Sequence, residues 1–378
     1  MTYFDYAASS PISNKALQTY IESSQKYYAN SSSLHSYGYG ASSLLEYCRN
    51  TIASLLKINP HGIYFTSGGT EANILCVQSI LNGLPKNKRK IIISPLEHSS
   101  LHNAISLWKE KGYEVIITPL TNEGTIDIQQ FENMLTSEVA IVIIQHINSE
   151  TGIIQPMKQI GELTKKHKIH WHTDCVQSVG KYDLYIEEWG VTSFSSSAHK
   201  FYGPKGIGFA YINPSVLWKS DIPGITHEKG FRAGTVPVPL IAAMTTALQE
   251  SYEEKEVRVT HLLELHNECR KLLQPLQVLT PTTEFAPHIM GILLPNMEGQ
   301  WAMLECDRRG IAISTGSACL VGMNEPSHAV TALGIDGEHA KSFIRASFGI
   351  HTTKEDILLL TSTLHKIVED VEARKQQV

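Results

Sequence analysis

From Leu44 to Ile212 the chain alternates short apolar runs with longer amphipathic stretches. The apolar runs are rich in isoleucine and valine and predict strands at 62–66, 90–94, 114–119, 139–146, 169–173, 193–197 and 208–212. The stretches between them have helical spacing and predict helices at 44–56, 70–83, 99–112, 127–136 and 157–168. Short buried strands separated by amphipathic helices are typical of a mostly parallel sheet covered on both faces. The sequence therefore predicts an α/β fold.

The two ends of the chain predict a smaller second domain. Residues 1–12 read as a short polar lead, 15–28 as a helix, and 30–43 as a long loop at the rim of a site, because that stretch is rich in serine, glycine and tyrosine. After the alternating region, the pattern predicts long charge-rich helices over 236–273, strands at 288–294 and 311–314, and helices at 299–309 and 327–333. We expect a large domain at 13–255 and a small α+β domain made of 1–12 and 256–378.

Composition limits the classes of partner. The 378 residues are 42% hydrophobic and 18% charged, which suits one large core and a smaller second one. A net charge of -5 without a long basic run argues against nucleic acid or an anionic membrane as the main partner. The first residues lack the features of a signal peptide, and no apolar stretch approaches the length of a membrane span. Six widely spaced cysteines without a Cys-x-x-Cys motif predict a reduced, cytoplasmic setting.

Ligands in open α/β sheets bind beyond the carboxyl ends of the strands, and Lys200 follows one such end in Ser197-Ala-His199-Lys200. A lysine amine that is withdrawn from water becomes a nucleophile toward carbonyls and forms Schiff bases with aldehydes such as pyridoxal phosphate. Ser197 and His199 could contribute to a phosphate site beside it. The alternative is that Lys200 is a surface loop residue.

A second strand end carries Thr66-Ser-Gly68-Gly69-Thr70-Glu-Ala-Asn73, which opens a helix. Two glycines let the backbone approach an anion, the free amides of the helix start attract it, and Thr70 adds a hydroxyl. The motif therefore predicts a phosphate cup. An ordinary helix cap with a tight turn is the alternative. The motif lacks the spacing of a Walker loop or of a dinucleotide fingerprint.

Two further strand ends carry His98 and Asp174. The planar, titratable ring of His98 could stack on an aromatic cofactor or move protons, or it could simply lie beside capping serines. Asp174 could keep a pyridinium nitrogen protonated so that the ring serves as an electron sink, and Gln177 could then bond the phenolic oxygen. The alternatives are a helix cap at Asp174 and a metal site at His170, His172 and Cys175, for which a further ligand at compatible spacing is not evident.

Six motifs together are similar, in order, to those of the cysteine desulfurases of the NifS/IscS type, in the class V aminotransferase group of pyridoxal-phosphate enzymes. They are Thr66–Asn73, Glu97-His98, His172–Gly180, Ser197–Gly206, Gly230–Thr235 and Ser314–Cys319, and the likeness extends from Asp5 to Arg345. The resemblance implies the α/β fold type I of pyridoxal-phosphate-dependent transferases, with a mostly parallel seven-stranded sheet, and a homodimer.

The resemblance also implies roles for particular residues. The cofactor pyridoxal 5'-phosphate would be bound by Gly69, Thr70, His98, Asn148, Asp174, Gln177, Ser197, His199, Lys200 and, from the neighbouring subunit, Thr235. Arg345, with Asn148, would hold the substrate carboxylate. One motif departs from the family pattern, because paired asparagines usually precede the glutamate and this chain reads Asn148-Ser149-Glu150. The family asparagine that contacts ring and substrate aligns with Ser149.

The loop around Cys319 contains small, flexible residues and is predicted to be mobile. A thiol there could carry sulfur from a buried cofactor to a partner; a free cysteine in a surface loop is the alternative. We expect L-cysteine to be converted to L-alanine, with Lys200, His98 and the Cys319 thiolate as catalytic groups and a sulfur-acceptor protein as partner, such as an iron–sulfur scaffold or a thiolation protein. A selenocysteine lyase, another class V enzyme and a non-enzymatic scaffold are the alternatives.

Overall fold

A computed structural model describes residues 1–282, 284–316, 326–335 and 337–375. The strands are β1 (Thr2–Tyr3), β2 (Ile63–Thr66), β3 (Lys90–Ile93), β4 (Glu114–Ile117), β5 (Val139–Ile143), β6 (His170–Asp174), β7 (Ser193–Ser197), β8 (Gly208–Ile212), β9 (Gln277–Val278), β10 (Ile289–Leu293), β11 (Ile311–Ala312) and β12 (Phe343–Ser347). The α-helices are α1 (Asn14–Lys26), α2 (Ser36–Leu56), α3 (Gly69–Gly83), α4 (Ser99–His102), α5 (Ala104–Glu110), α6 (Ile128–Met134), α7 (Met157–His167), α8 (Ile186–Trp189), α9 (Val238–Glu253), α10 (Lys255–Leu272), α11 (Gly299–Arg308), α12 (His328–Ala332), α13 (Gly337–Lys341) and α14 (Lys354–Lys375). Three 3-10 turns are η1 (Pro60–Gly62), η2 (Ala198–Lys200) and η3 (His227–Gly230).

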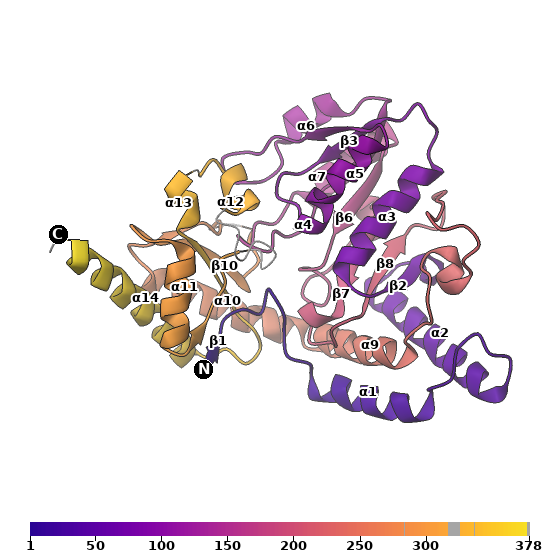
Figure 1. The fold of residues 1–378 in the computed structure, drawn as a ribbon, viewed down its shortest axis with the longest axis horizontal. Helices are drawn as coiled ribbons and strands as arrows, with labels where there is room; N and C mark the ends of the chain where they lie inside the picture. The colour runs from indigo at the N-terminus through magenta and orange to yellow at the C-terminus, as the bar shows by residue number, and fades with distance from the viewer. Residues whose placement is uncertain (283, 317–325, 336, 376–378) are drawn as a thin grey trace.

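The larger part of the molecule is built on a seven-stranded sheet in the order β2-β8-β7-β6-β5-β3-β4 (Figure 1). The pairs β3–β4, β3–β5, β5–β6 and β6–β7 are parallel, and only β8 runs antiparallel to its neighbours β2 and β7. All seven predicted strands are present, and those at 193–197 and 208–212 have the predicted limits. The prediction of a mostly parallel α/β sheet is confirmed.

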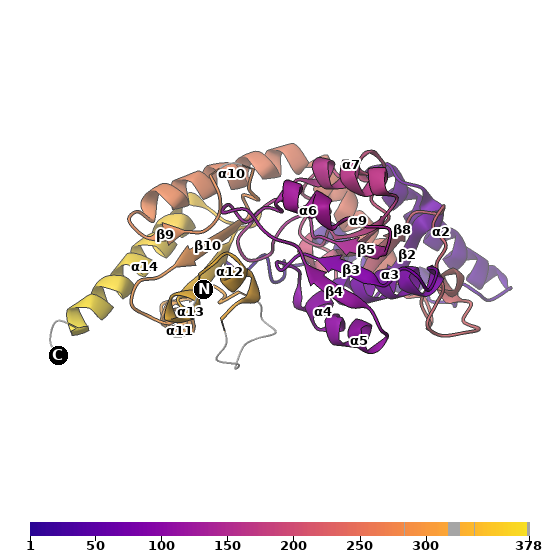
Figure 2. The same cartoon turned by 90° about the horizontal axis from the view of Figure 1, so that it is seen from above.

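Helices cover both faces of this sheet, as the sequence predicts. Figure 2 shows α6 and α7 on one side and α3, α4 and α5 on the other. Successive residues of β3 accordingly enter different apolar clusters: Ile92 packs with the cluster that includes α2, α7 and α9, whereas Ile91 and Ile93 pack with α3 and Trp108 of α5. Because both faces are buried, β3 and β5 are apolar except for Lys90 at the start of β3. The central strands β6 and β7 differ, since they carry buried polar residues along their length, among them His172 and Ser195.

Two sequence predictions need correction. The predicted loop over 30–43 is wrong in its second half, because α2 begins at Ser36, and no residue of 30–43 lines the cleft described below. His35 caps this helix by accepting from the Gly38 amide at 3.2 Å, and a Cβ at Gly38 would lie 2.2 Å from the Ser33 oxygen. The glycine is therefore needed for close packing against the preceding turn and does not signal a loop.

The second correction concerns the predicted helix over 99–112. It is present as two shorter helices, α4 and α5, which meet at Asn103.

The smaller part contains an antiparallel sheet in the order β12-β10-β9, with α10, α11 and α14 packed around its apolar core. Figure 2 shows α10 passing from the larger part to the smaller one. The start of the chain crosses in the same way, because β1 pairs in parallel with β11 and Asp5 bridges to Ser347. In the part of the chain that the structure describes, none of the helices combines the length and the apolar character that crossing a bilayer requires.

Candidate active site

A cleft of about 270 Å³ lies between the two parts, beyond the carboxyl ends of the parallel strands. Residues from the larger part, from the start of the chain and from the smaller part all contribute to its wall. They are Ala7, Ala8, Gly69, Thr70, Asn73, His98, Gln145, Ile147, Ser149, Asp174, Val176, Gln177, Ser197, His199, Lys200, Gly316 and Arg345. The four motifs that follow β2, β3, β6 and β7 thus face one another, as strand ends of one sheet must.

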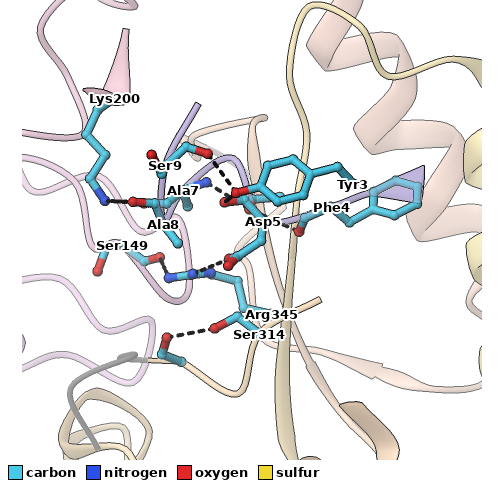
Figure 3. Close-up of polar contacts among 12 residues, drawn as sticks. Tyr3, Phe4, Asp5, Ala7, Ala8, Ser9, Ser149, Lys200, Ser314 and Arg345 are labelled. Carbon is cyan, nitrogen blue, oxygen red and sulfur yellow. Dashed lines mark hydrogen bonds and ion pairs between the residues drawn. The ribbon is translucent and has the colours of Figure 1, made fainter. Parts of the chain in front are cut away.

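Lys200 lies in η2, directly after β7, and its amine points toward the first residues of the chain (Figure 3). Its Nζ donates to the main-chain oxygen of Ala8 at 2.8 Å and to that of Ala7. The side-chain amide of Gln177 donates to the same Ala7 oxygen at 2.9 Å. The carbonyls at the start of the chain therefore fix two side chains that the sequence predicts to be at the site.

Asp174, at the end of β6, is held by Asn73, a residue of α3. The Asn73 amide donates to Asp174 Oδ2 at 2.7 Å, and the Val176 amide donates to Oδ1 at 2.8 Å. Asn73 Oδ1 lies 3.0 Å from Nε2 of His172, whose Nδ1 lies 2.9 Å from the Ser193 hydroxyl. Burial lowers the pKa of His172 to about 3, so the ring is neutral and donates to Asn73. Both ring nitrogens are thus engaged in hydrogen bonds, which argues against the metal alternative considered for this strand.

His98 caps α4 and lines the cleft. Its Nδ1 accepts from the Ser100 amide at 3.1 Å, and the Ser100 hydroxyl lies 2.9 Å from the same nitrogen. The pKa of His98 is lowered mainly by burial, with a further contribution from Lys200, while Asp174 opposes the shift. The neutral ring with the proton on Nε2 follows, because Nδ1 is occupied as an acceptor. The cap and the cleft-lining position are thus compatible.

The wall formed by Gly68, Gly69 and Ser197 is shaped for close approach to an anion. No side chain caps the start of α3, and Gly68 has a φ of 153°. A Cβ at Gly69 would lie 2.6 Å from Cγ2 of Val176, so only glycine fits there. His199 adjoins this wall, and its pKa is lowered to about 3 by burial and by the nearby Lys200. This wall, called the glycine cradle below, therefore attracts anions through its amides and hydroxyls and not through a charged histidine.

Arg345, in the middle strand position of β12, reaches into the cleft from the smaller part (Figure 3). Its Nη1 donates to the Ser149 oxygen at 2.9 Å, and its Nη2 lies 2.7 Å from Oδ1 of Asp5. The side chain is 4% exposed, and its Nε has no hydrogen-bond partner among the described residues. This buried guanidinium can receive a carboxylate.

Asn148 and Thr235, which the resemblance places at the site, do not line this cleft. Asn148 is buried and bonds within its own loop, with Oδ1 accepting from the amides of Glu150 at 3.0 Å and Thr151 at 2.8 Å, while Ser149 faces the cleft in its place. Thr235 is exposed on the surface. Cys319 lies outside the described residues.

Sequence reasoning missed Ala7, Ala8 and Asn73. The two alanines give no chemical signal, since only their carbonyl groups act. Asn73 stands one turn into the helix that the glycine motif opens, and a polar residue on the inward face of a buried helix could have pointed to it.

The five cysteines that the structure describes are all buried and free. Burial raises the pKa of Cys48 to about 11 and the pKa values of Cys269 and Cys306 to about 12, and it also raises the pKa values of Cys76 and Cys175. None of these five thiols can supply a thiolate near neutral pH.

Comparisons with known proteins agree with this architecture. Residues 2–360 match the family model of class-V aminotransferases. The chain is 44% identical over 369 residues to a candidate cysteine desulfurase, NifS, of Bacillus subtilis (strain 168), covering 96% of this chain and 93% of that one. A solved NifS-like protein has a TM-score of 0.91 at 28% identity, over 97% of this chain and 99% of the other. The structure of SspA in complex with cysteine has a TM-score of 0.82 at 28% identity, and the match covers 93% of this chain and 100% of that one.

The structural matches confirm the fold-type prediction, an α/β fold type I with a seven-stranded central sheet. The sequence match extends over nearly the whole of both chains, so it covers every motif that carries the resemblance. The chain therefore belongs to the class-V aminotransferase family and, within it, to the cysteine desulfurases of the NifS type.

Proposed function

We propose that the protein is a cysteine desulfurase that converts L-cysteine to L-alanine and transfers the sulfur to its own Cys319. The observation that carries this proposal is the presence of an amine (Lys200), a buried carboxylate (Asp174) and a buried guanidinium (Arg345) around one cleft. The cysteine-bound relative SspA supports L-cysteine as the substrate.

The residues of the cleft fit pyridoxal 5'-phosphate as the cofactor. The glycine cradle with Thr70, Ser197 and His199 suits the phosphate, Asp174 suits the ring nitrogen, Gln177 the phenolic oxygen, and the ring of His98 a stacking position. Lys200 would hold the aldehyde. When bound, this cofactor supplies an electron sink that stabilises negative charge on the substrate Cα.

The chain's own residues then have distinct tasks. Arg345 holds the substrate carboxylate with paired N–H donors, and its contact with Ser149 fixes the direction of the fork. Lys200 moves the Cα proton, and the neutral His98 carries a proton at Nε2. Asp174 is held in place by the bonds from Asn73 and Val176.

Sulfur transfer is assigned to Cys319, since the thiols of the five described cysteines are buried. The Cys319 thiolate attacks the substrate sulfur; an S–S bond forms as the substrate C–S bond breaks. The electron pair of that bond remains on the substrate carbon, which is protonated to give alanine. A sulfur-acceptor protein removes the sulfur in a later step. The free cysteines also support a reduced setting inside the cell.

A homodimer is part of the proposal. Exposed apolar and aromatic side chains concentrate on α1, α2 and the segment between them, namely Leu17, Tyr20, Ile21, Tyr27, Tyr28, Leu34, Tyr37, Tyr39 and Tyr47. A surface of this kind favours burial against a second copy. Thr235 is exposed and would reach the phosphate of the neighbouring subunit. The domain limits at 12/13 and 255/256 stay a prediction.

Anaerobic incubation with L-cysteine and a reductant tests the function, with alanine and sulfide measured together. Equal amounts of both products are expected from the wild type, and the Cys319→Ser variant is expected to bind cofactor and substrate without forming a persulfide. Normal sulfide release by that variant would falsify the role given to Cys319.

A further inference from the structure

Glu150 is a buried carboxylate for which the proposed reaction has no use. It is 7% exposed, and its amide donates to Asn148 Oδ1 at 3.0 Å. The preceding residue, Ser149, accepts from Arg345 Nη1 at 2.9 Å. Glu150 therefore lies one residue from the contact that orients the predicted substrate-binding arginine. A buried carboxylate needs partners that compensate for the loss of water, and those partners are informative here.

The first partner is Ser327, which caps α12. The Ser327 hydroxyl accepts from the amides of Ala329 at 3.1 Å and Val330 at 3.3 Å, and it donates its own proton to Oε2 of Glu150. A serine cap that accepts twice has one proton left to give, and the carboxylate takes it. Glu150 thereby fixes the start of α12 against the larger part of the molecule.

The carboxylate of Glu150 also lies close to Gly316, without a hydrogen bond to it. A Cβ built at this residue would lie 3.0 Å from Oε2 of Glu150 and 3.3 Å from its Cδ. Gly316 has a φ of 102°, a conformation that favours glycine, and its carbonyl oxygen accepts from the Ser314 hydroxyl at 3.0 Å. The same carboxylate oxygen thus lies against the backbone of Gly316 and bonds the side chain of Ser327.

Residues 316 and 327 flank the stretch of sequence that carries Cys319. We propose that Glu150 is a positioning residue for sulfur transfer, because one carboxylate oxygen bonds Ser327 on one side of that stretch and lies close to Gly316, a residue of the cleft wall, on the other. The bond to Ser327 fixes the start of α12, and the close approach to Gly316 restricts the other flank, on the side of the cleft where Arg345 would hold the substrate carboxylate. The inference rests on the proposed function, and in particular on Cys319 as the sulfur acceptor.

The chain offers a matched control for the hydrogen bond between Ser327 and Glu150. Ser13 caps α1 by accepting from the Ala16 amide at 3.1 Å, and it donates its proton to Oε2 of Glu250. This pair has the same chemistry but connects α1 to α9 and lies outside the cleft. Glu250→Ala therefore removes a glutamate acceptor from a serine cap without touching the predicted sulfur-transfer route.

The test compares holoenzymes of the wild type, Glu150→Ala, Glu150→Gln, Gly316→Ala and Glu250→Ala. Persulfide on Cys319 is measured by mass spectrometry in a single turnover with L-cysteine, and KM is measured at steady state. Glu150→Ala is expected to slow persulfide formation about a hundredfold with little change in KM, because a reacting group is misplaced while substrate binding is kept. Glu150→Gln keeps an oxygen for Ser327 and is expected to recover most of the rate. Gly316→Ala is expected to slow the step although the carboxylate remains.

Hydrogen exchange of the Ala329 and Val330 amides gives a readout that does not depend on activity. Faster exchange is expected in Glu150→Ala, and wild-type exchange in Glu150→Gln and Glu250→Ala. A wild-type rate of persulfide formation in Glu150→Ala, or unchanged exchange at the start of α12, overturns the inference. If the wild type forms no alanine from L-cysteine, the proposed function fails by itself, and the exchange data still decide whether Glu150 anchors α12.

Discussion

The amine of Lys200 and the main-chain oxygen of Ala8 lie 2.8 Å apart, although 192 positions separate the two residues in sequence. The start of the chain therefore forms one wall of the cleft at the point where the proposed carbonyl chemistry takes place (Figure 3). A group placed so specifically should be indispensable.

Replacing Lys200 with alanine is expected to abolish turnover, since both the covalent attachment of the cofactor and the Cα base are lost. The wild type is expected to be yellow and to retain a pyridoxyl label on Lys200 after borohydride reduction. Lys271→Ala, an exposed substitution on α10, serves as the control. A wild-type protein without colour or label would contradict the proposed cofactor.

Asp174→Asn is expected to keep the bond from Asn73 in altered form but to lose the negative charge opposite the ring nitrogen. We expect the rate of alanine formation to fall on the order of a hundredfold or more, the usual effect of losing one electrostatic contact in an active site. Cofactor retention is measured by absorbance after gel filtration. A rate within twofold of the wild type would show that Asp174 has only a structural role.

Arg345→Lys tests the carboxylate site. A lysine cannot reproduce the paired donors of a guanidinium, so the KM for L-cysteine is expected to rise by about ten- to a hundredfold. Because the bond to Ser149 is also lost, the kcat is expected to fall as well. Cysteamine lacks the carboxylate and therefore serves as the comparison. The variant and the wild type are expected to have equally low kcat/KM values for it.

Stability is expected to fall in acid through buried neutral histidines. His266 lies in the core of the smaller part, where Nδ1 bonds the Pro287 oxygen at 3.2 Å, and its pKa is lowered to about 3 by burial and by Arg270. The unfolded ring titrates near 6.5, so the unfolded state binds the extra proton at lower pH. The contribution of His266 to the free energy of unfolding should be constant above about pH 6.5 and should drop by about 1.4 kcal/mol per pH unit between about pH 6.5 and its folded pKa of about 3.

Urea unfolding at pH 7.5 and 5.5 measures this slope. His266→Gln is expected to be less stable than the wild type at pH 7.5 but to lose less stability on acidification. His61→Gln, at an exposed position, should follow the wild type at both pH values. Equal slopes for His266→Gln and the wild type would rule out the burial effect.

The dimer can be tested by mixing inactive subunits. Thr235→Ala is expected to weaken cofactor binding if Thr235 serves the neighbouring site, and Lys200→Ala is inactive in its own site. Exchange of subunits between the two variants should restore activity to about a quarter of the wild-type value. Half of the dimers are then mixed, and each mixed dimer contains one intact site out of two. Absence of recovery, when mass spectrometry shows mixed dimers, would place Thr235 outside the neighbouring site.

The sequence predicted most of the sheet because strands such as β5 and β8 are short apolar runs bounded by turn residues. It also predicted which strand ends carry polar chemistry, and the structure brings Thr70, His98, Asp174 and Lys200 to one cleft. It could not predict contacts made by main-chain groups, such as the carbonyls of Ala7 and Ala8, because any residue can supply them. It also missed that Gly38 allows close packing against Ser33, since that contact depends on how the chain folds around the start of α2.

The contact of Arg345 with Asp5 joins residues 340 positions apart. During synthesis on the ribosome, Asp5 emerges early, and its partner Arg345 is made only after nearly the whole chain has been synthesised. A truncated nascent chain that lacks β12 would thus have most of the large sheet but an unfinished pocket for the substrate carboxylate. Because closing so long a loop is slow, completion of that pocket should be among the last events of folding.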